Sequence, residues 1–217
     1  MSRPVVAVLD YGAGNLRSAQ RGLERAGATV VVTAAADDAS AADALVVPGV
    51  GHFASCLAGL RAAGLATLVA EWVEADRDLF GICVGMQLLY EHSDEGDTPG
   101  LGLLPGRVVR LREHVRVPHT GWDEVVATAA GRDDPLLAGI DGARAYFVHS
   151  YHPLPADPAH VLAVCDYGNA FPCVVRSGRV VGTQFHPEKS GDVGARLLAS
   201  WVSTLRAAAP AVVAPAP

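Results

Sequence analysis

The first 82 residues alternate between short apolar runs and segments of helical periodicity, and this alternation constrains the fold more than any other feature. We predict strands over residues 4–9, 29–33, 44–47 and 79–82. We predict helices over residues 16–26, 53–63 and 65–75, where apolar positions recur on one face. Successive β–α–β units place parallel strands side by side, with helices on both faces of the sheet. Side chains that follow these strands should therefore gather beyond their carboxyl ends, at one sheet edge.

After residue 100 the helical pattern gives way to strand-like runs joined by short turns. These runs cover residues 108–111, 146–148, 161–165, 173–176 and 180–185. We predict that they form antiparallel strands that extend the sheet. A final helix is predicted over residues 192–206, so that residues 1–206 form one domain. The tail 207–217 contains only Ala, Pro and Val and is predicted to be disordered.

Charge and cysteine content argue against several classes of protein. The net charge is −6, from 17 Lys and Arg against 23 Asp and Glu, and there is no basic stripe, which disfavours binding to nucleic acid or anionic membranes. No apolar run reaches the roughly 18 residues of a membrane span, and the N-terminus enters a strand without a signal-peptide pattern. The four cysteines form no C-x-x-C pair, so we expect free thiols in a reducing, cytoplasmic setting.

The segment Gly81-Ile82-Cys83-Val84-Gly85-Met86-Gln87 places a cysteine on a turn between a strand and the start of a helix. This arrangement resembles a nucleophile elbow, where the flanking residues must be small because the bend is sharp. A thiol at a helix N-terminus also lies near the positive end of the helix dipole, which favours the reactive thiolate. A lone cysteine beside Ile and Val is more often a core residue, so a second signal is needed.

That second signal is the segment Gln184-Phe185-His186-Pro187-Glu188, about a hundred residues further on. His186 can act as the base that a thiol nucleophile requires, and Glu188 can hold the imidazole in position. A cysteine that only fills the core needs neither flanking glycines nor a distant histidine. We therefore predict that Cys83, His186 and Glu188 form a catalytic triad.

These motifs resemble those of the class I (triad) glutamine amidotransferases. Three further segments are similar to the glutaminase subunits of imidazole glycerol phosphate synthase, which serve histidine biosynthesis: Pro48–Phe53, Val117–Trp122 and Tyr146–Tyr151. The resemblance runs from about Val5 to about Leu205. It implies a three-layer, flavodoxin-like α/β fold, with a mixed, mostly parallel central sheet and an antiparallel extension.

The same resemblance implies an enzyme that hydrolyses L-glutamine to glutamate and ammonia. It assigns the oxyanion hole to the backbone at Gly49, Val50 and Val84, where glycine allows a peptide to turn its donor toward the developing charge. It assigns glutamine binding to five residues, namely Gly51, Gln87, Glu95, Ser150 and Tyr151. We expect neither a metal nor an organic cofactor.

The resemblance also implies a partner, a separate (β/α)₈-barrel cyclase subunit that forms a heterodimer with this chain. The cyclase would use the ammonia to make imidazole glycerol phosphate and an aminoimidazole carboxamide ribotide. The matching interface positions are Asn15, Trp122, Tyr146 and Lys189. The chain departs from the family at Thr120 and Asp123, where Met and Asn are usual, and this departure bears on docking and oxyanion control.

Two alternatives stay open on the sequence. The chain could supply ammonia to another pathway, such as anthranilate, purine or pyridoxal phosphate synthesis. It could also be a non-catalytic docking homologue, although retention of all three triad residues argues against this.

Two further kinds of site are disfavoured. A dinucleotide site at Gly12 and Gly14 lacks the third glycine of its motif, because Arg17 stands there. His149 and His152 are interpreted as structural or interface residues, because no His or Cys spacing fits a zinc pattern.

Overall fold

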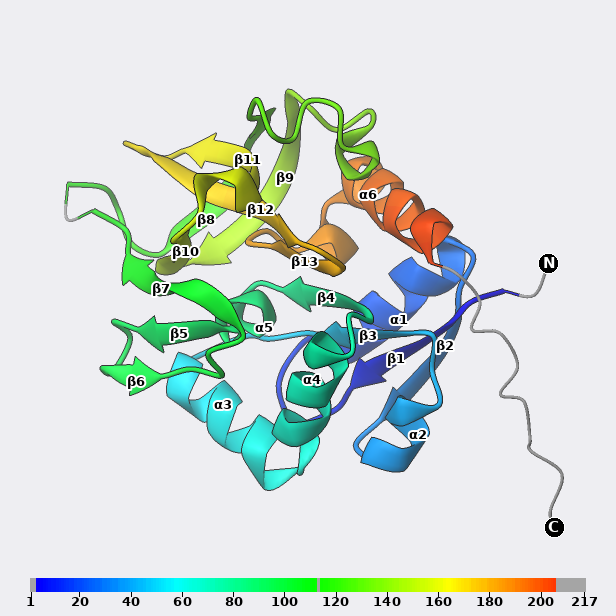
Figure 1. The fold of residues 1–217 in the computed structure, drawn as a ribbon. Coiled ribbons are helices and arrows are strands. Elements are labelled where there is room, and N and C mark those ends of the chain that lie inside the picture. Colours follow the sequence, from blue (N-terminus) through cyan, green and yellow to red (C-terminus); the bar gives the residue numbers. More distant parts are fainter. Residues whose placement is uncertain (1–2, 113, 206–217) are drawn as a thin grey trace, which may run out of the picture.

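A nine-stranded mixed sheet runs through the centre of the fold, in the order β2-β1-β3-β4-β13-β12-β11-β8-β9 (Figure 1). Its strands are β1 (Val5–Leu9), β2 (Thr29–Thr33), β3 (Ala44–Val47), β4 (Asp78–Ile82), β8 (His119–Ala127), β9 (Ala143–His149), β11 (Val161–Asp166), β12 (Ala170–Ser177) and β13 (Val180–Thr183). This computed structural model describes residues 3–112 and 114–205. The predicted tail 207–217 and the last predicted helical residue, Arg206, lie outside the described residues.

The half of the sheet from β2 to β13 is parallel and is covered by helices on both faces, as predicted. Helices α1 (Leu16–Arg25) and α6 (Gly191–Thr204) lie on one face, and α2 (Ala36–Ser40), α3 (Phe53–Ala62) and α4 (Leu65–Glu74) lie on the other (Figure 1). Strands β3 and β13 are buried along their whole length, which is typical of parallel strands between two helical layers.

Helix α6 is anchored to the sheet by one apolar face. Its buried residues recur at the spacing of a single helical face and are Gly194, Leu197, Leu198, Trp201 and Val202. The ring of Trp201 meets the ring of Phe80 on β4 edge-on, with centroids 5.1 Å apart. This packing fixes the segment just before α6, residues 184–190, above the end of β4.

The other half of the sheet, from β12 to β9, is antiparallel, which confirms the predicted extension. Strand β8 was not among the predicted strands, because only His119 and Val125 are buried along it and its apolar alternation is therefore weak. Its register with β9 places His119 opposite His149 and Trp122 opposite Tyr146.

A second sheet of four short strands was not predicted. It has the order β10-β7-β5-β6 and consists of β10 (Tyr151–Pro155), β7 (Leu104–Arg110), β5 (Tyr90–Ser93) and β6 (Thr98–Pro99). The predicted strand 108–111 overlaps its strand β7 and does not extend the central sheet, so that assignment was wrong. Two prolines within β10 hide its strand character, since proline removes a backbone donor from the ladder. The short helices α5 (Val84–Gln87), η1 (Pro135–Leu137), η2 (Pro158–His160) and η3 (Pro187–Lys189) complete the elements.

Across residues 3–112 and 114–205, no single helix is long and apolar enough to cross a membrane. Helices α3 and α4 taken together reach that length and composition, but the chain bends by 92° between them.

Candidate active site

Cys83 lies on the sharp turn between β4 and α5, where the sequence predicts a nucleophile. Its backbone has φ 53° and ψ −114°, a conformation that non-glycine residues rarely adopt and that costs of order 1–3 kcal/mol. The side chain is 2% exposed. The Cys83 N–H donates to the Thr183 carbonyl over 2.8 Å, so the ladder between β4 and β13 continues up to Cys83.

Glycines allow the elbow to pack against the neighbouring strand end. A Cβ atom at Gly85 would overlap the carbonyl oxygen of Val47 at the end of β3. A Cβ atom at Gly49 would overlap the Gly85 backbone nitrogen. The elbow and the segment 48–51 are therefore in backbone contact, which brings the predicted oxyanion residues next to Cys83.

His186 follows β13, the parallel neighbour of β4, and its ring is held by Glu188. The Nδ1 atom lies 2.8 Å from Glu188 Oε1, and both side chains are at most 2% exposed. The Nε2 atom is buried and makes no well-formed hydrogen bond with the described residues. Burial lowers the pKa of His186, but its interactions with the Cys83 sulfur and the Glu188 carboxylate outweigh this and raise it to about 10. The ring therefore favours the imidazolium form beside the thiol.

Backbone contacts fix the position of His186. Its N–H donates to the Tyr146 carbonyl on β9 over 3.0 Å. The Ser190 hydroxyl donates to the His186 carbonyl over 2.7 Å and accepts from the Tyr146 N–H over 3.0 Å. The segment 186–190 is thus tied to β9 as well as to β13.

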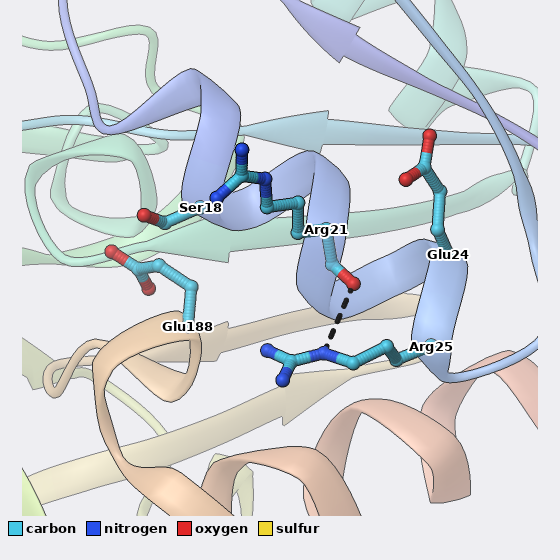
Figure 2. Close-up of a pocket in the computed structure, with 5 residues that line it drawn as sticks. All are labelled: Ser18, Arg21, Glu24, Arg25 and Glu188. Atoms are coloured by element: carbon cyan, nitrogen blue, oxygen red, sulfur yellow. Dashed lines mark hydrogen bonds between the residues drawn. The ribbon is translucent and has the colours of Figure 1, made fainter.

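The Glu188 carboxylate faces helix α1 (Figure 2). Figure 2 shows the carboxylate turned toward Ser18, above a cavity of about 500 Å³ that Arg21, Glu24 and Arg25 also line. The Oε2 atom is buried and has no hydrogen-bond partner among the described residues. Ser18 was not identified from the sequence, because nothing in its local pattern links α1 to the triad.

A second cavity, which we call the central cavity, opens beside the elbow and has a volume of about 250 Å³. All five residues predicted to bind glutamine line it: Gly51, Gln87, Glu95, Ser150 and Tyr151. Val50, Val84 and His186 line it too, whereas Gly49 and Cys83 do not. Three of its lining residues were not predicted as site residues, namely Pro118, Val148 and His149.

Glutamine side chains connect the central cavity to Cys83. Gln87 Nε2 donates to the Tyr151 carbonyl and to Gln184 Oε1, each over 2.9 Å. Gln184 Nε2 lies 3.5 Å from Cys83 Sγ and donates toward it. Gln184 has no accessible surface, and its sequence pattern predicts no role for it beyond membership of the motif. Glu95 Oε2 accepts from the Phe53 N–H over 2.8 Å and so also caps α3.

The peptides around the predicted oxyanion segment are held from two sides. The Tyr11 hydroxyl donates to the Pro48 carbonyl, and Cys56 Sγ donates to the Val50 carbonyl over 3.2 Å. The peptide between Gly49 and Val50 lies between these two anchored groups. Val84 is the first residue of α5, where backbone N–H groups have no partner within the helix.

The family model described as "Glutamine amidotransferase class-I" matches residues 7–203 of the chain. The chain belongs to the class I glutamine amidotransferase family. It is 51% identical over 210 residues to the "Imidazole glycerol phosphate synthase subunit HisH" of Mycobacterium tuberculosis, covering 94% of this chain and 100% of that protein. It is 48% identical over 206 residues to the subunit of the same name from Halobacterium salinarum, covering 91% and 92%. The predicted narrower resemblance, to a subunit of this synthase, is therefore confirmed.

Solved structures of glutamine amidotransferases share the fold. One, described as "Crystal structure of glutamine amidotransferase", aligns with a TM-score of 0.71 at 24% identity, covering 91% of this chain and 98% of that chain. "Structure of PurLQS from Thermotoga maritima" aligns with a TM-score of 0.74 at 21% identity, covering 94% and 100%. These likenesses confirm the predicted fold class.

The amidotransferase presents three of its four predicted interface residues as one cluster. Trp122 is 48% exposed, and its ring centroid lies 5.9 Å from that of Tyr146 on the neighbouring strand. Lys189 Nζ lies 5.9 Å from the centroid of the Tyr146 ring. The fourth, Asn15, is the residue that precedes α1 and is partly exposed.

The two departures from the amidotransferase pattern differ in their surroundings. Thr120 is exposed on β8. Asp123 Oδ2 lies 2.7 Å from His119 Nε2, and His119 Nδ1 lies 3.1 Å from His149 Nε2. His149 and His152 are both buried. Within residues 3–112 and 114–205, no group of three or more His, Cys, Asp or Glu side chains is placed to hold a metal ion.

Proposed function

We propose that this chain is the glutaminase subunit of an imidazole glycerol phosphate synthase and that Cys83, His186 and Glu188 carry the reaction. The observation that carries the proposal is the state of His186. Its Nδ1 atom is tied to a buried carboxylate, while its Nε2 atom is unpaired beside the Cys83 sulfur. This is the arrangement that a thiol nucleophile needs from its base.

In the proposed mechanism, Cys83 Sγ attacks the side-chain amide carbon of glutamine, and His186 Nε2 holds the proton of the thiol. The carbonyl π bond opens to give a tetrahedral oxyanion. His186 then protonates the amide nitrogen, the C–N bond breaks, and ammonia leaves a γ-glutamyl thioester on Cys83. Water, deprotonated by His186, attacks the thioester, and glutamate and the Cys83 thiol are released. Glu188 stays ionised throughout and stabilises the imidazolium.

The oxyanion is proposed to accept from the backbone N–H groups of Val84 and of the Gly49–Val50 peptide. Contact between Gly49 and Gly85 supports this, because it brings both groups to one side of the elbow. Each such donor typically contributes about 2.7–4 kcal/mol to transition-state stabilisation. Gly51, Gln87, Glu95, Ser150 and Tyr151 are proposed to bind glutamine, since all five line the central cavity.

We propose that the ammonia passes to a (β/α)₈-barrel cyclase subunit, which makes imidazole glycerol phosphate in histidine biosynthesis. The relatives at about half identity are named as subunits of this synthase, which supports a partner of this kind. Asn15, Trp122, Tyr146 and Lys189 are proposed to meet the cyclase. Exposure of Trp122 beside Tyr146 and Lys189 supports an aromatic and cationic contact surface at this place.

We also propose that residues 1–206 form one amidotransferase domain in the cytoplasm. The family match over residues 7–203 supports the domain. The four cysteines are buried and carry no disulfide, which suits a reducing compartment.

The test separates ammonia production from ammonia use. In the complex with the cyclase, Cys83→Ala should abolish glutamine-dependent synthesis, while added ammonium salt at alkaline pH still supports it. The matched control is Cys165→Ala, the same change at a buried cysteine on β11 that does not line the central cavity, which should keep glutaminase activity. Loss of both activities in Cys83→Ala would assign the cysteine a structural role and overturn the proposal.

A further inference from the structure

A continuous series of hydrogen bonds runs from the carboxylate of Asp123 to the wall of the central cavity. Asp123 Oδ2 lies 2.7 Å from His119 Nε2, and His119 Nδ1 lies 3.1 Å from His149 Nε2. His149 Nδ1 lies 2.9 Å from the Tyr151 carbonyl oxygen. The carboxylate is 38% exposed, whereas the His119 side chain is only 1% exposed, so the series leads from the surface inward.

The proton positions in this series follow from the chemistry of its ends. The Tyr151 carbonyl can only accept, so His149 Nδ1 must carry a proton and donate it. Burial lowers the pKa of His149 to about 3, so the ring is neutral and its Nε2 atom is an acceptor. His119 Nδ1 must therefore donate to it.

His119 then faces a carboxylate through its other nitrogen, and this contact is a hydrogen bond when the His119–Asp123 pair carries one extra proton. Burial lowers the pKa of His119, and the hydrogen bond and charge of Asp123 offset this lowering only in part. The other groups packed on the ring are Phe147, His149, Tyr167 and Phe171.

The Tyr151 carbonyl receives a second donor from the opposite side. Gln87 Nε2 donates to it over 2.9 Å and also to Gln184 Oε1 over 2.9 Å, which uses both protons of the amide. Gln184 Nε2 donates toward Cys83 Sγ at 3.5 Å. One backbone carbonyl thus joins the histidine series to the groups around the nucleophile.

We propose that His149 is a positioning residue for the glutamine-binding backbone at Ser150 and Tyr151, and that Asp123 and His119 hold its ring in the donating orientation. The inference rests on the proposed function of the central cavity and extends it to residues that do not touch the reacting atoms. Without His149, the Tyr151 carbonyl would be held by Gln87 alone. The expected consequence is weaker binding of glutamine rather than slower chemistry.

Two substitutions at residue 123 distinguish loss of the hydrogen bond to His119 from loss of the negative charge of Asp123. Asp123→Ala removes the outer anchor of His119. Asp123→Asn keeps the anchor, because an amide N–H can donate to the Nε2 atom of a neutral His119 whose Nδ1 still donates to His149. Asp166→Ala, at an exposed position on neighbouring β11, removes one negative charge without touching the series and serves as the control.

The kinetic test measures glutaminase activity of the full chain with its synthase partner. Asp123→Ala should raise KM for glutamine about three- to tenfold with little change in kcat, which is the range expected for one lost hydrogen bond. Asp123→Asn should restore a KM close to that of the wild type, and Asp166→Ala should match the wild type. His149→Phe should raise KM more than Asp123→Ala does, with folding checked by circular dichroism. If His149→Phe does not fold, Asp123→Ala decides the matter.

A spectroscopic test reads the ring protons directly. Long-range ¹H–¹⁵N spectra of the histidine side chains should show His149 protonated at Nδ1 in the wild type and in Asp123→Asn. At mildly acidic pH, His119 should carry protons on both nitrogens in the wild type and only on Nδ1 in Asp123→Asn.

The inference fails if His149 is protonated at Nε2 alone, or if Asp123→Ala has the same KM as Asp166→Ala in a complex that hydrolyses glutamine. A wild-type complex that releases no glutamate from glutamine would instead refute the proposed function.

Discussion

Two buried histidines in this chain lie at almost the same distance from a carboxylate oxygen, yet their pKa values are shifted in opposite directions. His186 lies 2.8 Å from Glu188, and His119 lies 2.7 Å from Asp123. Both imidazoles are buried, which lowers the pKa of each. The pKa of His186 is nevertheless raised to about 10, whereas that of His119 stays below its ordinary value.

The difference lies in what else each ring meets. Two groups raise the pKa of His186, namely the Cys83 sulfur and a Glu188 side chain that is only 2% exposed. The pKa of His119 is raised by one group, the Asp123 carboxylate, on a side chain that is 38% exposed, and aromatic rings pack on the faces of the imidazole. One partly exposed carboxylate does not offset the lowering of the histidine pKa by burial, whereas a buried carboxylate together with a sulfur does. The same residue types are therefore proposed to give a base at one site and a positioning group at the other.

Neutralising the buried carboxylate should produce the largest effect. Glu188→Gln keeps the shape of the side chain but removes the charge that stabilises imidazolium, so kcat should fall at least about a hundredfold while KM for glutamine stays nearly unchanged. Steady-state glutaminase kinetics on the complex measure both constants. Glu71→Gln, the same change on the exposed face of α4, is the control. An unchanged kcat would remove Glu188 from the triad and leave a Cys–His dyad.

The next effect concerns activation by the partner. We expect the chain alone to be a poor glutaminase. Since the His186–Glu188 pair is already formed in this single chain, the expected cause is a missing oxyanion donor at the Gly49–Val50 peptide. A lost donor of roughly 3 kcal/mol lowers the rate about a hundredfold. We expect glutamine turnover to rise at least about tenfold when the cyclase and its nucleotide substrate are both added. Equal rates for the chain alone and for the liganded complex would contradict a latent site.

The third effect is a difference in how the His186 and His149 regions contribute to the stability of the fold as the pH changes. A raised pKa means that His186 stabilises the fold fully below about 6.5 and loses this contribution as the pH rises toward about 10, by up to about 1.4 kcal/mol per pH unit. His149, with its pKa lowered to about 3, has the opposite sign and loses its contribution as the pH falls below about 6.5.

Urea unfolding at a series of pH values measures both contributions. Glu188→Gln should flatten the loss of stability on the alkaline side and leave the acidic side unchanged. Parallel curves for the wild type and Glu188→Gln at alkaline pH would show that the carboxylate does not raise the pKa of His186.

The sequence predicts the triad side of the molecule better than the side that contains His119. Glycines at 81 and 85 around Cys83, and Glu188 two residues after His186, are local patterns that a reader can recognise. His119 and His149 are 30 residues apart and meet only through the register of β8 with β9. Because β8 has few buried apolar residues, neither the strand nor its register could be predicted, and His149 was interpreted only as structural or interface.

The same distinction holds for the fold. The parallel strands β1 to β4 were predicted to within one residue because apolar runs and helix stops mark them. Strand β5 depends on pairing with β7, and strand β6 depends on pairing with β5, and their own residues carry little pattern. No role was predicted for Gln184, since its contact with Cys83 depends on the pairing of β13 with β4.

The strained backbone of Cys83 means that a substitution which stabilises the fold at this position can also remove the reactive thiol. With φ 53° and ψ −114°, this residue has the conformation of the first central position of a type II′ turn, where glycine is favoured. Cys83→Gly should therefore relieve part of a strain of about 1–3 kcal/mol and raise the melting temperature while it removes the nucleophile. A directed-evolution screen that rewards only heat resistance would accordingly favour loss of this thiol, so such a screen on this chain needs glutamine hydrolysis as a second criterion.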